Sequence, residues 1–507
     1  PISNSGTSYC IYLNHQVGEN VSFNSLTSAT ISGTAVTLRG IYKDYSTGAS
    51  IVGTTNINSN TITITDNFTS GTLECIRTQG TVANTSTCNL NNNTILNTSV
   101  GGAASSTTIV GVVNSSVWGT LNMNSNIIRG TTSTATTGGF TGVSNTGSVV
   151  TTININSNQI GNASGNAITF SAATSGAVLG VNCSGGASTC ATTVTLNDIQ
   201  KIVHTVTGSG AVTPILVSGT PLTLNLSNNT LTNLTLNTTG TTRLISYSYT
   251  APATGTKTVN NNSIVTQLTR ATSTAEFEAL YDWGSTNSGS TITVTNNNFS
   301  NLTLPGASTT FYGFRLDDGG TGATHIVTGN TLSNWSTGST SILGMIFANY
   351  FGTGTNSVSN NTISNITGKG SIIGILAAAN GTAPTVLNIN SNTVSGLVSS
   401  GTGGSVTGLT TSNTSASINI YKNIISDLST TATTSLVAGL TISGSGTNLN
   451  VYNNLIGNLT ASASNNTTID AVRGVNITST SATSSINLFY NTIRIYWSLY
   501  NQVCLSN

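Results

Sequence analysis

Acidic and basic side chains are rare in this chain, and the largest group of them lies between residues 270 and 325. Carboxylates beside a cation could serve a polysaccharide hydrolase or lyase, because such enzymes need an acid, a base or nucleophile, and a group that stabilises developing charge. If the chain is an enzyme, its candidate catalytic residues are therefore Glu276, Glu278, Asp282, Arg315, Asp317 and Asp318. Arg270 and His325 complete the group.

The same charges also have a structural interpretation, because their positions repeat relative to a series of asparagines. Asp282 and Arg315 each lie 15 residues before an asparagine of that series, and Arg243 and Glu278 each lie 19 residues before one. Opposite charges at equal offsets in successive repeats predict stacked salt bridges, each worth at most about 1 kcal/mol if exposed. We favour this interpretation over the catalytic one.

The asparagine series is the feature that must position these residues. Fifteen times the chain repeats an apolar residue, two mostly polar residues, an asparagine, any residue and another apolar residue, at intervals of 31 to 39 residues. The asparagines are Asn24, Asn60, Asn93, Asn126, Asn158, Asn197, Asn229, Asn262, Asn297, Asn330, Asn361, Asn392, Asn423, Asn454 and Asn491. A fixed period of this length predicts a repeat architecture.

The residues within each repeat predict short strands and turns. Alternating β-branched and polar residues, as in Thr61 to Thr65 and Thr291 to Thr295, are typical of strands, and helix-forming runs are missing. Hairpin arrays and propellers are the alternatives to a solenoid for such a unit. In a solenoid the coils lie about 4.8 Å apart, so equivalent asparagines stack and their amides hydrogen-bond, whereas propeller blades hold equivalents far apart. Asparagine also tolerates the left-handed backbone conformation of a sharp bend, where we expect these residues to lie.

Composition favours the same fold. Asp, Glu, Lys and Arg make up 5% of the chain, against about 25% in ordinary globular domains. Like charges stacked every 4.8 Å or so would repel each other, so stacked columns favour neutral polar residues. Disorder is disfavoured because 36% of the residues are hydrophobic and they recur in register.

These repeats resemble those of right-handed parallel β-helix proteins of the pectin-lyase-like architecture. The similarity is carried by segments such as 387–394 (LNINSNTV) and 153–160 (ININSNQI), and by glycine–apolar pairs such as Gly111-Val112 and Gly374-Ile375 in an earlier strand of the coil. The resemblance implies an all-β, single right-handed parallel β-helix of about 15 coils with an asparagine ladder. It covers about residues 20 to 495 and specifies fold more than function.

We predict one continuous β-helix domain over residues 1–507, because no linker interrupts the register. The chain starts without Met or a signal sequence and ends shortly after Asn491, so we expect both ends to continue or to be uncapped.

Six cysteines suggest the compartment. Cys75 and Cys88 flank one predicted loop, and Cys183 and Cys190 flank another in the longest interval of the series. We predict that each pair forms a disulfide that staples its loop, which would indicate an oxidising, extracellular location; six reduced structural cysteines are the alternative.

Other functions find little support in the sequence. We expect no cofactor and no metal site, since no CxxC or HxxxH spacing occurs, and no membrane span, since no apolar run is long enough. A net charge of +1 argues against nucleic acid. The leading hypothesis is a secreted or cell-surface structural or adhesive rod, similar to large bacterial adhesins. Its partners would be glycans, other surfaces, or copies of itself associated end to end. A polysaccharide lyase or glycoside hydrolase is the alternative.

Overall fold

The structure is a computed structural model with two compact units, Pro1–Ser290 and Thr291–Asn507. It describes residues 6–14, 18–28, 30–45, 52–102, 105–266, 268–270, 275–284, 289–306, 311–317, 323–340, 343–349, 351–352, 354–378, 386–412, 414, 417–463, 471–480 and 482–495. The described strands of the two units form an all-β parallel β-helix solenoid with an asparagine ladder, which confirms the predicted fold class. Its longest sheets contain 15 strands, in agreement with the predicted number of about 15 coils.

In the N-terminal unit four parallel sheets run along the solenoid. The first sheet contains β1 (Thr7–Asn14), β5 (Val36–Tyr45), β9 (Gly71–Thr81), β13 (Thr108–Val117), β17 (Phe140–Asn145), β21 (Val178–Cys183), β25 (Val212–Val217), β29 (Thr242–Ser246) and β33 (Phe277–Asp282). The second contains β2 (Asn20–Ser22), β6 (Thr54–Asn58), β10 (Thr87–Asn89), β14 (Thr120–Asn122), β18 (Thr152–Asn156), β22 (Ala191–Thr195), β26 (Thr223–Ser227) and β30 (Thr256–Asn260).

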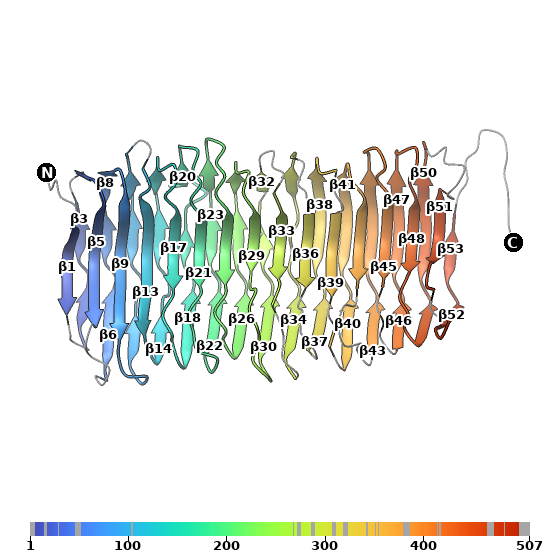
Figure 1. The fold of residues 1–507 in the computed structure, drawn as a ribbon, viewed down its shortest axis with the longest axis horizontal. Coiled ribbons are helices and arrows are strands. Elements are labelled where there is room, and N and C mark those ends of the chain that lie inside the picture. Colours follow the sequence, from blue (N-terminus) through green and yellow to red (C-terminus); the bar gives the residue numbers. More distant parts are fainter. Residues whose placement is uncertain are drawn as a thin grey trace. The chain divides into compact units, whose positions relative to one another are not determined.

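The other two sheets of this unit have shorter strands. The third contains β3 (Ser25–Thr27), β7 (Thr61–Thr63), β11 (Thr94–Leu96), β15 (Ile127–Arg129), β19 (Gln159–Ile160), β23 (Asp198–Gln200), β27 (Thr230–Thr232) and β31 (Ser263–Ile264). The fourth contains β4 (Ile31–Gly33), β8 (Thr65–Phe68), β12 (Ser99–Val100), β16 (Thr132–Ser133), β20 (Ile168–Phe170), β24 (Ile202–His204), β28 (Thr235–Leu236) and β32 (Leu268–Arg270). Strands that follow each other by one coil, such as β5, β9 and β13, lie side by side (Figure 1).

The C-terminal unit repeats this plan, with one strand covering the third and fourth positions in most coils. Its first sheet contains β36 (Phe311–Asp317), β39 (Leu343–Asn349), β42 (Ile372–Ala377), β45 (Val406–Thr411), β48 (Val437–Ile442) and β51 (Val472–Ile477). Its second sheet contains β34 (Thr291–Thr295), β37 (Thr324–Thr328), β40 (Thr355–Ser359), β43 (Val386–Asn390), β46 (Ser417–Tyr421), β49 (Asn448–Tyr452) and β52 (Ser485–Phe489). The remaining sheet contains β35 (Leu302–Leu304), β38 (Thr331–Thr337), β41 (Thr362–Gly368), β44 (Thr393–Ser399), β47 (Ile424–Thr430), β50 (Leu455–Ala461) and β53 (Thr492–Arg494).

The strands form because their apolar residues alternate with polar ones. In β18, Ile153 and Ile155 are buried while Thr152, Asn154 and Asn156 face outward. Stacking of equivalent strands therefore builds a continuous apolar interior within each unit, and each coil buries its apolar side against its neighbours.

The recurring asparagines form the predicted inner ladder in both units. Asn60 Nδ2 donates to Asn93 Oδ1 at 3.0 Å, and Asn423 Nδ2 donates to Asn454 Oδ1 at 2.9 Å. The backbone N–H of each asparagine donates to the same Oδ1, as from Asn60 to Asn93 at 3.0 Å. A second Nδ2 bond reaches a carbonyl of the preceding coil, at 2.8 Å for Asn93 and Ile57. Each amide thus connects three successive coils.

The left-handed bend lies one residue earlier than predicted. The residue before each ladder asparagine, such as Ser157 (φ 58°) or Asn360 (φ 54°), has positive φ, whereas the ladder asparagines themselves do not. The bend turns the following side chain inward, where the ladder requires an amide of fixed length. The residue at the bend varies because its side chain is exposed or half-buried and does not have to fit the interior.

The glycine–apolar pairs have a packing reason. A Cβ added at Gly111 would lie 2.7 Å from Ile128 Cδ1 and 2.5 Å from the carbonyl oxygen of Gly142. At Gly374 it would lie 2.6 Å from Val394 Cγ1. Glycine therefore lets the first sheet approach the apolar residue that follows the ladder asparagine across the narrow interior.

Candidate functional site

The structure confirms one of the two charge pairs predicted from equal offsets. Arg243 in β29 is in register with Glu278 in β33, and Arg243 Nε lies 3.3 Å from Glu278 Oε2. The same guanidinium donates to Glu276 through Nη2 at 3.1 Å and lies 3.7 Å from the ring centroid of Tyr281. Glu278 is fully buried. Its carboxylate therefore has a structural partner and little access to a substrate.

Asp282 forms a second ion pair, which the offsets did not predict. Lys257 Nζ in β30 lies 2.9 Å from Asp282 Oδ1 and 3.1 Å from Oδ2 inside the solenoid, and both side chains are buried. The ammonium also lies 4.5 Å from the ring centroid of Tyr249. Burial raises the pKa of Asp282, and the adjacent Lys257 opposes that rise. The predicted pairing of Asp282 with Arg315 joins residues of different units and stays a prediction.

The C-terminal unit holds the remaining candidates. Arg315 Nη2 in β36 lies 3.5 Å from Asp317 Oδ2, and Asp317 Oδ1 accepts a hydrogen bond from Asn349 Nδ2 at 2.9 Å. The guanidinium of Arg315 lies 5.0 Å from the ring centroid of Tyr312. Asp318 lies outside the described residues. Because the candidates are divided between two units, a shared catalytic groove stays a prediction.

Two further charged networks in the N-terminal unit were missed by the sequence analysis. On the outer face of the first sheet, Glu74 pairs with Arg39 at 2.6 Å and also with Arg77. In the interior, Lys43 pairs with Glu19, whose Oε2 accepts a hydrogen bond from Thr55. Like Lys257, Lys43 occupies an inward position of its strand that would ordinarily be apolar. A lysine at an inward position of the alternating pattern was the sequence signal that could have predicted a buried ion pair.

The predicted disulfides are wrong. Cys75, Cys88, Cys183 and Cys190 are free, buried thiols. Their positions explain this, because they take core positions of the strands. Cys88 is in register with the inward-facing Leu121 of the next coil, and Cys183 is in register with the buried Val217. Each is a small core residue of a strand or its edge, and burial raises the pKa of Cys75 and of Cys183 to about 12. Cys504 lies outside the described residues.

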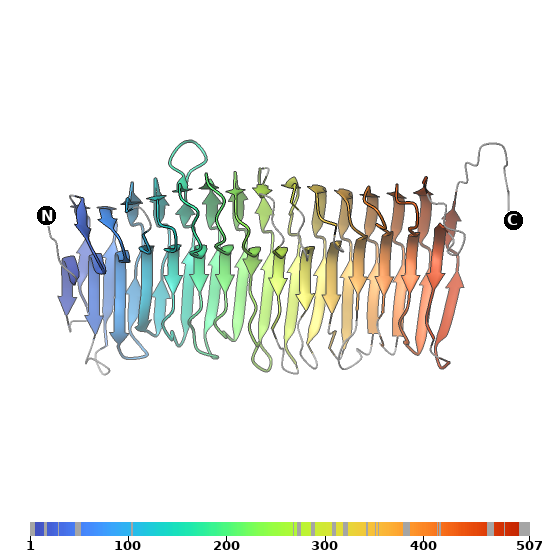
Figure 2. The ribbon, with the colours of Figure 1, turned by 45° about the horizontal axis from the view of Figure 1, so that its top comes forward.

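The extra length of the longest interval also lies elsewhere than expected. It is not between Cys183 and Cys190 but between β19 and β20, where residues 161–167 form a loop that projects from the N-terminal unit (Figure 2).

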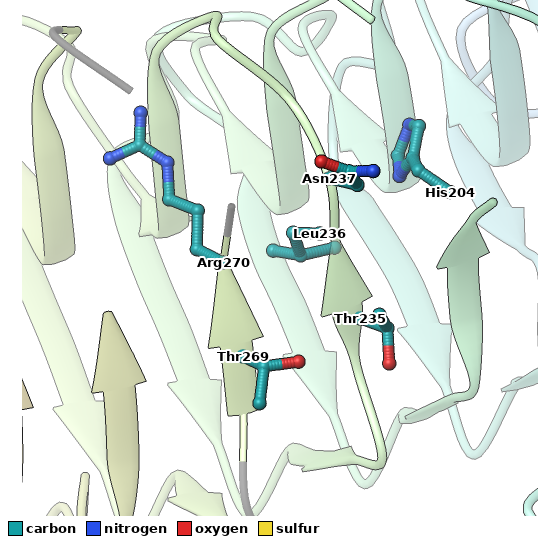
Figure 3. A pocket seen from close by; sticks show the side chains of 6 residues that line it. All are labelled: His204, Thr235, Leu236, Asn237, Thr269 and Arg270. Carbon is teal, nitrogen blue, oxygen red and sulfur yellow. The ribbon is translucent and has the colours of Figure 1, made fainter. Parts of the chain in front are cut away.

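A cavity of about 240 Å³ lies at the fourth sheet of the N-terminal unit (Figure 3). It is lined by His204, Thr235, Leu236, Asn237, Thr269 and Arg270. His204 and Arg270 take inward positions: His204 is in register with Phe170, and Arg270 with Leu236. The shorter Leu236 between two long side chains leaves the space.

The two titratable residues that line this cavity, His204 and Arg270, are buried. The imidazole of His204 stacks on Phe170 with centroids 4.7 Å apart, and burial lowers its pKa to about 4 although a hydrogen bond to the backbone of Thr235 opposes the change. Burial lowers the pKa of Arg270 to about 10, while Glu278 opposes the change, so the guanidinium keeps its charge near neutral pH. Arg270 Nη2 donates to the carbonyl of Gly240 at 2.9 Å.

Within the described ranges, three or more His, Cys, Asp or Glu side chains do not gather where they could hold a metal ion. Over the same residues, no helix is long and apolar enough to cross a membrane. Comparison of the chain with protein-family models, curated proteins and solved structures gave no match. The parallel β-helix is shown by the structure itself, whereas the resemblance to pectin-lyase-like and adhesin proteins stays a prediction.

Proposed function

We propose that this chain is a structural, adhesive β-helical solenoid of the cell surface or extracellular space, and that it binds glycans through a neutral face. The observation that carries this proposal is a second amide ladder on the outer face of the second sheet. In the N-terminal unit, Asn89 Nδ2 donates to Asn56 Oδ1, and Asn122 Nδ2 donates to Asn89 Oδ1, both at 2.8 Å.

The C-terminal unit repeats this outer ladder beside an aromatic row. Asn419 donates to Asn388 at 2.9 Å, and Asn450 donates to Asn419 at 3.0 Å. Two residues further along the same strands, Tyr421 and Tyr452 stack with centroids 5.0 Å apart and an interplanar angle of 2°. We call the set of Asn419, Asn450, Asn487, Tyr421, Tyr452 and Phe489 the polar-aromatic face.

Two physical arguments connect this face with glycans. Its amides are fixed by their ladder bonds, so a ligand that binds them does not have to order them, which lowers the entropic cost of binding. Sugars present hydroxyl groups and apolar C–H edges, which match amides and aromatic rings without requiring charge. The burial and pairing of Glu278 and Asp282 add support for a role without catalysis.

The test measures binding of the full chain to insoluble cellulose, chitin and mannan by depletion from solution. Asn450→Ala combined with Tyr452→Ala should weaken binding about tenfold, since it removes amide and ring contacts together. Thr441→Ala is the matched control, because Thr441 faces outward on the first sheet in the same turn. Release of new reducing ends or unsaturated sugars from any of these polysaccharides would support an enzyme instead. Equal binding by the wild-type chain and both variants would contradict the proposal that the polar-aromatic face binds glycans.

The extracellular location rests on composition now that the disulfides are absent from the described residues. Association end to end stays a prediction.

A further inference from the structure

The cavity beside His204 contains a buried nitrogen that lacks a hydrogen-bond partner in the described part of the chain. His204 is 3% exposed, and its Nδ1 is among the buried polar atoms without a partner. Because the imidazole already donates to the backbone of Thr235 and is neutral near pH 7, Nδ1 is a hydrogen-bond acceptor. A ligand that satisfies it must therefore bring a hydrogen-bond donor.

The rest of the cavity supplies positive charge and donors. Arg270 contributes a guanidinium, which has five N–H groups in a fixed plane and suits oxyanions. Asn237 Oδ1 accepts a hydrogen bond from Thr207 Oγ1 at 2.9 Å, which leaves the amino branch of this amide as the donor. Glu278 acts on Arg270 through space, and Glu278 and Glu276 both pair with Arg243. Arg270 is therefore the one cationic group among the residues that line the cavity.

We propose that this cavity binds a phosphate group that carries a proton. The P–OH donates to His204 Nδ1, and the charged oxygens accept from Arg270 and Asn237. No bond is made or broken. A volume of about 240 Å³ is ample for such a group, since one water occupies about 30 Å³ of liquid. The ligand is either free phosphate or a phosphomonoester.

Sulfate provides the matched ligand, because it has the same shape and charge distribution but carries no proton near neutral pH. Calorimetry on the full chain is run at constant ionic strength and about pH 5.5, where inorganic phosphate and most of a phosphomonoester (second pKa about 6) carry the proton and His204 is still neutral. It should show binding of inorganic phosphate and at least about tenfold weaker binding of sulfate. Glucose 6-phosphate tested in parallel distinguishes the two sources, and binding of the ester alone would assign the site to phosphomonoesters. Equal affinity for sulfate and phosphate would overturn the role of His204, and absence of binding by both phosphate ligands would overturn the proposal.

Three variants test the residues. His204→Phe retains a ring against Phe170 but removes Nδ1, and Arg270→Gln removes the charge; each should weaken phosphate binding at least about tenfold. Asn237→Asp has the same shape, lies half-buried at a strand end, and replaces the donor by a carboxylate. Because it keeps the acceptor for Thr207, it should fold normally, as circular dichroism would check, yet lose phosphate binding. Unchanged affinity in folded His204→Phe or Asn237→Asp would contradict the proposed geometry.

Discussion

Replacement of Asn361 by alanine should destabilise the C-terminal unit strongly, because this residue lies within the inner ladder and is fully buried. Its Nδ2 donates to Asn392 Oδ1 and to the carbonyl of Val327, both at 3.0 Å. Its Oδ1 accepts from the backbone N–H of Asn330 at 3.0 Å and from Asn330 Nδ2 at 2.9 Å. Alanine removes all four bonds.

The magnitude follows from the groups left behind. The N–H of Asn330 and the carbonyl of Val327 each lose a partner in the interior, at a cost of about 1 to 3 kcal/mol for each unsatisfied group. Asn330 Nδ2 keeps its bond to Val294 at 2.9 Å, which limits the loss. We therefore expect the free energy of unfolding to fall by about 3 kcal/mol, or by more if the small cavity stays empty.

Urea unfolding followed by circular dichroism measures this change, and hydrogen exchange with mass spectrometry locates it to β37, β40 and β43. Asn388→Ala is the matched control, because Asn388 belongs to the outer ladder of the next coil and accepts one bond, from Asn419 at 2.9 Å. It should cost less than about 1 kcal/mol. If Asn361→Ala were no less stable than Asn388→Ala, the inner ladder would not support the fold as we describe.

Three other predictions concern the N-terminal unit and the thiols. Burial raises the pKa of Asp66 to about 7, so the folded state binds this proton more tightly than the unfolded state does, and the free energy of unfolding falls as pH rises from about 4 to 7. Asp66→Asn should abolish that fall and raise the free energy of unfolding at pH 7 by up to about 4 kcal/mol. Urea unfolding at a series of pH values measures both effects. Asp282→Asn should lower the free energy of unfolding by about 3 to 5 kcal/mol, because it leaves Lys257 without its buried counter-charge. Adding Lys257→Leu in a double-mutant cycle should recover most of this loss, whereas additive losses would show that the two residues are not coupled. In the native chain a maleimide should label the exposed Cys10 and leave the four buried cysteines unlabelled. In denaturant without reductant all four should react. Failure of these cysteines to react in denaturant would show that they form disulfides after all.

The repeat itself was predictable because it is written along the chain. A ladder asparagine must recur in every coil, and the strand before it must alternate, as in β18 and β43, so periodicity alone predicted strands, stacking and the inner amide bonds. The Arg243–Glu278 pair was found for the same reason, since the two residues occupy one column in adjacent coils.

Contacts across the interior were not predictable in this way. Lys257 and Asp282 lie on different sheets, and comparison of offsets detects only neighbours along a column. Pairing across a coil depends on the shape of its cross-section, which the turns between sheets determine. The prediction of disulfides was wrong for a related reason. The spacing of the cysteines suggested a stapled loop, whereas the alternation of inward and outward residues along the strands places the cysteines in the core, where a thiol serves as a small apolar side chain.

The directions of the two amide ladders explain how a nearly uncharged chain can stack so many dipoles. In the inner ladder Nδ2 donates toward higher residue numbers, as from Asn60 to Asn93, and the backbone N–H bound to the same Oδ1 fixes that orientation. In the outer ladder Nδ2 donates toward lower numbers, as from Asn89 to Asn56 and from Asn450 to Asn419. In the coils that carry both ladders, the two rows of side-chain dipoles run in opposite directions and partly offset each other. An outer face of this kind would attract a partner through local hydrogen bonds rather than through long-range charge, which fits the proposed binding of glycans.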